Sequence, residues 1–384
     1  RTLIEVIRRC ILLHISTRVN VSLISDFLSK LMRLPMRFFD SKLAGDLIRR
    51  IEDHNRIESF LTQSVLNILF STLTVVIFGI VLAIYSWKIF LIFILFSAAY
   101  MGWVKLFMRK RADLNRKNFE QMSVNQNNLM QLIYGMQDIK LLGCEQQKRW
   151  EWENIQASLF RINMSSLNLG QWQQVGAVLI NEVKNVLITV LSATAVLHGS
   201  ITLGVMLSIQ YIIGQMQGPI SQFVSFMQDT QDAQLSLERL GEIHGKPDEE
   251  TEGMDQDTQI SGKDPIQLQN VVFTYGSEKS KRIIKGLSLD IPAGKTTAIV
   301  GLSGSGKTTL IKLMLGFYPP TGGAVMIGNQ SLQKISFKEW RKHCGVVMQE
   351  GFIFGDTIAN NIAPDGSMID KERLLYAVEM ANIR

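Results

Sequence analysis

The stretch Gly301-Leu-Ser-Gly-Ser-Gly-Lys-Thr-Thr309 decides the fold of the C-terminal part of this chain. It matches the pattern G-x-x-x-x-G-K-[ST] in full. A β-branched run precedes it over 295–300, and a run with helical spacing of its apolar residues follows over 307–315. We therefore predict a buried strand, a glycine-rich turn and a helix, in that order. The alternative is a loop that only connects a strand to a helix, and the Lys-Thr pair argues against it.

The residue types in this loop suit the binding of a phosphate chain. Gly301, Gly304 and Gly306 allow backbone conformations that a Cβ opposes, so that N–H groups and a helix N-terminus point at an anion. Lys307 would reach the β- and γ-phosphates, and the Thr308 hydroxyl would hold Mg²⁺. The residues predicted to surround the phosphates are Gly301, Ser303, Gly304, Ser305, Gly306, Lys307, Thr308 and Thr309.

Composition indicates that this loop belongs to a membrane protein. Of 384 residues, 46% are hydrophobic and only 19% are charged, against about 25% charged in soluble domains. Two runs without charged side chains, 62–87 and 89–104, are each close to the length that crosses a bilayer. A longer charge-free tract, 185–228, contains a turn-like segment over 198–204. The sequence thus predicts four complete spans within a helical transmembrane domain, and a lipid bilayer as its surroundings.

The distribution of basic residues predicts the orientation of these spans. Lys88 alone lies between the first two, and the turn over 198–204 has no Lys or Arg, whereas Arg109-Lys-Arg111 and other basic pairs flank the opposite ends. Those ends, and the phosphate-binding loop with them, are expected in the cytosol. The net charge of +6 follows from this asymmetry. Because the basic residues are dispersed along helix ends, a nucleic-acid partner is not expected.

Glu182 and Lys184 lie at the start of the third span, the first of the two within the tract 185–228. They lie about 14 residues before His198, or roughly 21 Å along a helix, which is the level of the opposite leaflet. One interpretation is a pair whose charged groups reach the cytosolic interface, or lie on a helix that projects beyond it. The other is a polar contact to cargo or to a partner helix. The sequence does not choose between them.

Two breaker-rich segments, an acidic stretch and three cysteines lie outside the spans and the loop. The segments 34–47 and 134–143 combine helix breakers with short amphipathic stretches between long helical patterns, as hairpin tips do. An acidic stretch over 245–264, without apolar periodicity, is predicted to be a linker. Cys10, Cys144 and Cys344 have no metal-ligand or redox spacing and are expected to be reduced thiols.

Several motifs in order resemble the nucleotide-binding domain of ABC transporters. They are Phe273-Thr-Tyr275, the loop itself, Pro320-Thr-Gly-Gly323, Trp340-Arg341, Val346-Val-Met-Gln349 and Phe352-Ile-Phe354. The segments over 34–47 and 134–143 resemble the two coupling helices of ABC exporters. The resemblance covers essentially the whole chain. It implies a transmembrane domain over 1–244 and an α/β nucleotide-binding domain of the phosphate-loop type over 265–384. Within the exporters, the tract over 15–62 looks most like peptidase-containing bacteriocin and peptide exporters and type I secretion ATPases.

The resemblance also implies roles for individual residues. Tyr275 would stack on the adenine of ATP, Gln349 would meet Mg²⁺ or the attacking water, and Lys307 would act with Gln349 in catalysis. The family's Walker B carboxylates, signature motif and switch histidine are not found, and only four of six spans are seen, with 6–31 assigned to the cytosolic part of the second. The chain therefore looks like a fragment, inactive by itself. The sequence does not reveal whether a peptidase domain precedes it.

The function implied is ATP-driven export by a half-transporter in the bacterial cytoplasmic membrane. Its partners would be a second half-transporter, expected to be identical, and an exported cargo, expected to be a peptide or protein. A nucleotide-gated channel or regulatory membrane protein on the same scaffold is the alternative. A soluble ATPase with a buried apolar bundle is a third reading, and the long charge-free tract argues against it.

Overall fold

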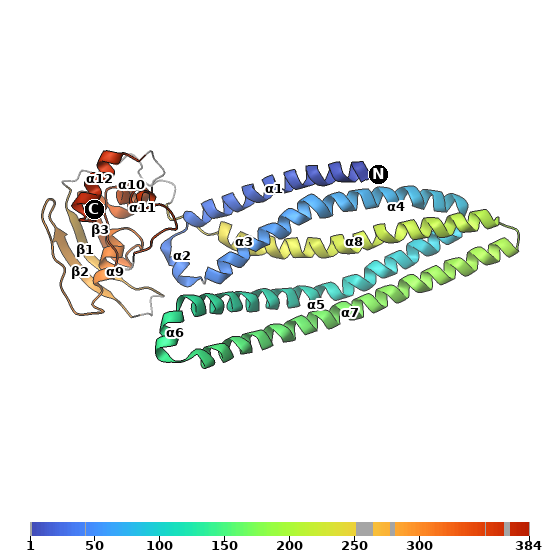
Figure 1. Ribbon diagram of the computed structural model, residues 1–384, viewed down its shortest axis with the longest axis horizontal. Coiled ribbons are helices and arrows are strands. Elements are labelled where there is room, and N and C mark those ends of the chain that lie inside the picture. Colours follow the sequence, from blue (N-terminus) through green and yellow to red (C-terminus); the bar gives the residue numbers. More distant parts are fainter. Residues whose placement is uncertain are drawn as a thin grey trace. The chain divides into compact units, whose positions relative to one another are not determined.

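The computed structural model describes residues 2–42, 44–250, 264–276, 281–349, 351–364 and 369–383. The chain divides into two compact units, Arg1–Thr251 and Glu252–Arg384. The first is helical, and the second combines a sheet with short helices (Figure 1). Most of the expected acidic linker, 251–263, lies outside the described residues.

Long helices make up the first unit. Its helices are α1 (Thr2–Met32), α2 (Met36–Ser41), α3 (Ala44–Ser59), α4 (Val65–Tyr85), α5 (Trp87–Tyr134), α6 (Met136–Leu142), α7 (Glu145–Leu197) and α8 (Leu203–His244). A π-helical turn, Phe60–Ser64, joins α3 to α4. Figure 1 shows α5 and α7 side by side, with α6 between their ends. The two segments with helix breakers, 34–47 and 134–143, each contain one short helix, α2 or α6.

Among the described residues, four helical stretches are long and apolar enough to cross a membrane: Cys10–Met32, Gly45–Tyr85, Trp87–Tyr134 and Glu145–Leu197. Three details differ from the expectation. The first stretch qualifies, although 6–31 was expected to be cytosolic. Helix α8, expected as the fourth span, does not qualify, because glutamines and Pro219 lower the hydropathy of its first half. The break between the first two expected spans lies at Ser86 rather than Lys88.

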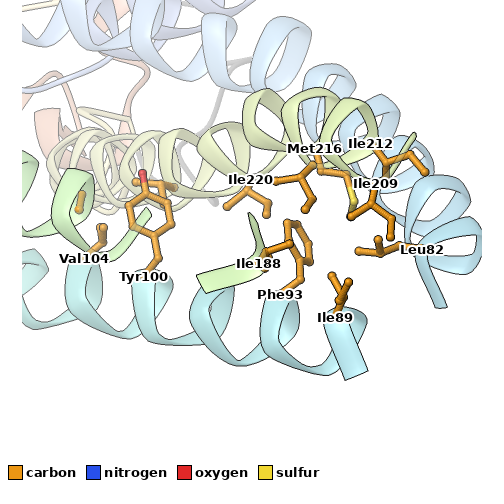
Figure 2. Packing of buried hydrophobic residues seen from close by; sticks show 13 residues of the cluster. Leu82, Ile89, Phe93, Tyr100, Val104, Ile188, Ile209, Ile212, Met216 and Ile220 are labelled. Atoms are coloured by element: carbon orange, nitrogen blue, oxygen red, sulfur yellow. The ribbon is translucent and has the colours of Figure 1, made fainter. Parts of the chain in front are cut away.

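The core of the first unit lies where α4, α5, α7 and α8 meet. Figure 2 shows aliphatic side chains around Phe93, among them Leu82, Ile188 and Met216. Lipid tails are as apolar as these side chains, so close packing rather than exclusion of water stabilises such a cluster in a membrane.

Lys184 belongs to the same buried region. Its side chain is only 2% exposed, its Nζ donates to Asn181 Oδ1 at 2.9 Å, and it lies 5.1 Å from the centre of the Phe93 ring. The Lys184 ammonium group is therefore enclosed by the first unit, whereas the first interpretation needs both charged groups at its surface; Glu182 is exposed.

Two glycines permit close approach between helices. A Cβ on Gly176 of α7 would lie 2.3 Å from the Trp103 ring of α5. A Cβ on Gly45 would lie 3.0 Å from the backbone nitrogen of Asn127, whose Oδ1 accepts a hydrogen bond from Gly45 N at 3.0 Å. Asn127 thereby satisfies an N–H in the first turn of α3, which has no partner within its own helix. The start of α3 is held against α5.

Ion pairs hold α3 to the end of α8. Arg239 donates to both carboxylate oxygens of Asp53 at 2.6 and 2.7 Å, and Ser236 donates to the same carboxylate at 2.9 Å. Arg50 donates to Glu242 at 2.7 Å, and this hydrogen bond lowers the pKa of the Glu242 carboxyl. Paired in this way, the nearly buried Asp53 and Arg50 do not carry the cost of an isolated buried charge.

The second unit is built on an antiparallel sheet with strand order β2-β1-β3-β4. The strands are β1 (Ile266–Phe273), β2 (Ile284–Ile291), β3 (Gly322–Ile327) and β4 (Gln330–Ser331). The helices are α9 (Lys307–Met314), the 3-10 turn Leu332–Lys334, α10 (Phe337–Lys342), α11 (Ile358–Ile362) and α12 (Lys371–Met380). Leu310 and Leu313 of α9 pack with Leu268, Val271 and Val325 of the sheet.

The strand expected before the phosphate-binding loop is not formed. Residues 296–300 pair with no strand among the described residues, and 345–349 are also unpaired there. Val300 is 92% exposed and Val347 is 100% exposed. A strand needs hydrogen-bonded neighbours, and β-branched residues alone do not supply them. The predicted order of loop and helix is nevertheless present.

Candidate nucleotide-binding site

The loop between residue 300 and α9 has the backbone shape that its glycines predict. Gly304 and Gly306 have φ of 77° and 96°, in the left-handed region that other residues rarely adopt. A Cβ on Gly301 would lie 2.9 Å from Ser305 Oγ. Gly306 is also the residue before the first turn of α9, so the turn ends directly at a helix N-terminus. This arrangement directs backbone N–H groups and positive helix-end charge toward one place.

Lys307 lies in the first turn of α9 and folds back over the loop. Its Nζ donates to the carbonyl oxygens of Gly301 and Leu302, both at 2.8 Å. The ammonium group is therefore positioned by the loop itself. Its place beside N–H groups at a helix N-terminus is chemically suited to a phosphate chain.

Tyr275 lies beside the same helix. Its hydroxyl donates to Thr309 Oγ1 at 3.2 Å, and its ring makes edge contacts with Phe273 and Tyr318 at 4.9 and 5.2 Å between centroids. Thr309 is buried, whereas Thr308 is exposed. The two adjacent hydroxyls thus point to different surroundings. Thr309 holds Tyr275, and Thr308 is open to a ligand such as a metal ion.

No hydrogen bond joins Gln349 to the loop among the residues that the structure describes. Gln349 is exposed, and no hydrogen bond of its side chain is found within the part of the chain that the structure describes. Its segment, 345–349, belongs to no sheet, so nothing fixes its distance from Lys307. Ser303 is also exposed. The predicted roles of both residues stay predictions.

The other end of α9 is held by a pair of side chains whose role the sequence did not reveal. Trp340 Nε1 donates to the Met314 carbonyl at 2.8 Å. Arg341 donates to the carbonyls of Leu315 and Gly316, both at 3.1 Å. These carbonyls at a helix C-terminus lack partners within the helix. A cation there is also attracted by the negative end of the helix dipole. The Trp-Arg motif was visible in the sequence, but its target lies about 26 residues away.

We predict that Arg341→Ala destabilises the second unit and weakens nucleotide binding. It leaves two carbonyls without their donor, which costs about 1–3 kcal/mol, at the end of the helix that carries Lys307. The thermal midpoint and the ATP affinity of the full-length protein, from fluorescence titration, measure the two effects. Lys342→Ala is the matched control, because in the described segments the ion pair of Lys342 is with Glu339 alone, on the surface. Equal thermal midpoints and equal ATP affinities in the two variants would contradict this role of Arg341.

Two features define the class of protein: helices of membrane-spanning composition and a phosphate-binding loop at a helix N-terminus, in one chain. The model of the ABC transporter transmembrane region matches residues 1–220, and the ABC transporter model matches residues 284–383. The chain belongs to the ABC transporter family. Binding of a nucleotide is the property that this family assigns to the second unit.

Curated relatives support the placement among exporters. The chain is 29% identical over 382 residues to the toxin RTX-I translocation ATP-binding protein of Actinobacillus pleuropneumoniae, covering 98% of this chain and 53% of that protein. Identity and coverage are the same for the alpha-hemolysin translocation ATP-binding protein HlyB of Escherichia coli. The leukotoxin translocation ATP-binding protein LktB of Mannheimia haemolytica matches at 29% over 382 residues, covering 98% and 52%. The chain spans about half the length of these relatives.

A solved structure agrees with the fold. The structure of a bacterial Atm1-family ABC exporter with ATP bound superposes with a TM-score of 0.90 at 20% identity, covering 100% of this chain and 67% of that one. At this identity the likeness concerns the fold alone. The predicted fold class, a helical membrane domain followed by an ABC nucleotide-binding domain, is confirmed.

Proposed function

We propose that this chain belongs to an ATP-driven exporter that moves a peptide or protein across the bacterial cytoplasmic membrane. The observation that carries the proposal is the formed phosphate-binding loop, with Lys307 Nζ in place, in the same chain as helices able to cross a membrane. Similarity to translocators of toxins supports a polypeptide cargo.

The proposed site uses residues of the second unit in distinct ways. The loop N–H groups and Lys307 bind the phosphates, and the Thr308 hydroxyl contributes a ligand to Mg²⁺, which prefers oxygen and keeps few protein ligands. The ring of Tyr275 stacks on the base. Gln349 acts beside the γ-phosphate once its segment is brought there. Bound magnesium would neutralise charge that develops on the transferred phosphoryl group.

The proposed division of the chain is a transmembrane domain over 1–244, a linker over 245–264 and a nucleotide-binding domain over 265–384, with the last in the cytosol. Two half-transporters, expected to be identical, would assemble around the cargo path. ATP binding and hydrolysis would then shift the membrane helices between inward and outward access.

Transport by the full-length protein in sealed vesicles tests this function. With ATP and Mg²⁺ on the nucleotide side, a fluorescent, unstructured, uncharged peptide is expected to accumulate inside above its outside concentration. A non-hydrolysable ATP analogue should not support accumulation, because uphill movement needs turnover. If the analogue and ATP both permit only downhill flux, the protein is a nucleotide-gated channel and the export proposal is wrong.

A further inference from the structure

A cavity of about 430 Å³ lies between α5, α7 and α8 and is unusual in its lining. Of eleven lining residues, six are amides: Asn115, Asn118, Asn163, Gln173, Gln174 and Gln228. We call it the amide cavity. Its volume falls within the range of about 300–1,000 Å³ of ligand sites, while most such sites are mainly apolar. The lining of the amide cavity consists mainly of side chains that form hydrogen bonds.

The amide cavity carries no net charge. Among the described residues that line it, Arg111 is the single charged one, and Asp232 accepts two hydrogen bonds from that guanidinium, at 3.0 and 2.7 Å. The cavity therefore has no free charge for an ionic ligand. It suits a neutral ligand that both donates and accepts hydrogen bonds.

Much of the hydrogen-bonding capacity of the cavity is unused by the protein. In the described part of the chain, the side chains of Gln173, Gln174 and Gln228 bond to no other residue. Asn118 donates to Asn163 Oδ1 at 2.8 Å, which leaves Asn118 Oδ1 and Asn163 Nδ2 available. Each amide side chain offers both a carbonyl acceptor and N–H donors. A peptide backbone offers the same two groups at every residue.

The walls of the amide cavity are fixed by contacts behind it. Trp103 Nε1 of α5 donates to the backbone carbonyl of Gln173 on α7 at 3.1 Å. On α8, Gln231 Nε2 donates to the carbonyl of Met108 on α5 at 2.9 Å, next to the Arg111–Asp232 pair. The amides thus project from three helices that are tied to one another, which reduces the ordering cost of binding.

The cavity lies at one end of the charge-free stretches. Gln228 is the last residue before Asp229, and Arg111 follows the apolar run of α5 by one to two turns. By the distribution of basic residues this is the cytosolic end. A substrate that leaves the cytosol passes this level before it enters the bilayer.

We propose that the amide cavity binds a short, extended stretch of the exported polypeptide through its backbone amides. This inference rests on the proposed function, since it assumes a polypeptide cargo. Pairing with backbone groups gives affinity without demanding particular side chains, as in strand addition to a sheet. A transporter with such a cavity would capture unfolded segments of varied sequence and would reject folded ones.

Photochemical crosslinking in the full-length protein tests the inference. A benzophenone side chain replaces Asn163 in the cavity or, as the control, Met164, which is exposed on the same helix outside it. The probe is a biotinylated, uncharged peptide of glycine, serine and asparagine. Capture at 163 should exceed capture at 164 by about ten-fold, and unlabelled peptide should compete while a malto-oligosaccharide does not.

Substitution of the amides provides the second arm. Gln173→Leu with Gln228→Leu keeps the side-chain size and should lower capture by about ten- to thirty-fold, since each change removes about one net hydrogen bond. Gln171→Leu, on the same helix but outside the cavity, should leave capture unchanged. The unchanged protein, the double variant and Gln171→Leu should bind a fluorescent ATP analogue with equal affinity. Equal affinity would exclude misfolding as the cause of lower capture.

Other outcomes overturn the inference. Equal capture at 163 and 164, or competition by the sugar alone, would show that the cavity does not select peptides. A crosslink to a second copy of the chain without peptide would make it a subunit interface. If vesicles accumulate peptide while position 163 captures none, this inference fails and the export function stands. If 163 captures peptide but ATP drives no accumulation, the export function fails and the cavity stands.

Discussion

Lys307→Ala is expected to reduce ATP turnover by the full-length protein by about 10²–10³-fold, the usual cost of removing one group that stabilises transferred charge. The ammonium group is held by two carbonyls of the loop and is the cation that the described structure places there. An alanine leaves the loop with N–H groups alone. Release of phosphate from purified protein in lipid nanodiscs measures the loss.

Lys312→Ala is the control for this experiment. Lys312 lies in the last turn of the same helix, so its removal changes the net charge of α9 equally. Turnover should stay within about two-fold, because dipole and charge effects fall off within one turn. Undiminished turnover in Lys307→Ala would show that the protein hydrolyses ATP without phosphate binding at this loop.

Gly323→Ala is expected to disrupt the sheet of the second unit. Gly323 has φ of 75°, and a Cβ there would lie 2.3 Å from the carbonyl oxygens of Gln269 and Asn270 on β1. The left-handed conformation alone costs a non-glycine residue about 1–2 kcal/mol. Moving backbone atoms apart adds about 1–3 kcal/mol.

The neighbouring glycine provides a matched control. A Cβ on Gly322 would meet Val272 at 3.6 Å, an ordinary contact, and its φ is not positive. Hydrogen exchange of amides in β1 and β3 reports the difference. A loss of about 3 kcal/mol accelerates exchange by about a hundred-fold in Gly323→Ala, whereas Gly322→Ala should change it little. Similar exchange in both variants would contradict the predicted clash.

The phosphate-binding loop and α9 could be predicted because their causes are local. Glycines at fixed positions set the turn, and apolar residues at helical spacing set the helix. The end of α9 is also local in origin. Gly316 has φ of 70°, and Phe317 N donates to Lys312 O at 3.0 Å, the bond that closes a helix with a left-handed residue.

The features that escaped prediction depend on residues far apart in the chain. The run over 295–300 has strand composition, yet a strand exists only where another strand pairs with it. Trp340 and Arg341 are adjacent in sequence, but the carbonyls that they bind belong to the end of another helix. Burial of Lys184 beside Phe93 likewise follows from how α7 packs on α5. Sequence periodicity identifies each helix and leaves the partner of each face open.

The amide cavity illustrates the same limit. Glutamines and asparagines on α5, α7 and α8 look like ordinary polar positions in the sequence, since no motif connects them. Their common level emerges only when the three helices are packed together. Gln349 is the opposite case. Its motif is recognisable in the sequence, but no contact among the described residues places it beside Lys307.

The length of α7 has a mechanical consequence. Its 53 residues extend about 80 Å, whereas the hydrocarbon core is about 30 Å thick. In the proposed orientation, with the His198 end at the far surface, about 50 Å of the helix would project beyond the core. A tilt of about ten degrees around that end would carry the Glu145 end about 14 Å, more than the diameter of a helix. The contact of Gly176 with Trp103 ties α5 to this lever. Small rotations within the bilayer thus become large displacements of α6, so a spin label on α6 is a sensitive reporter of motion in the membrane.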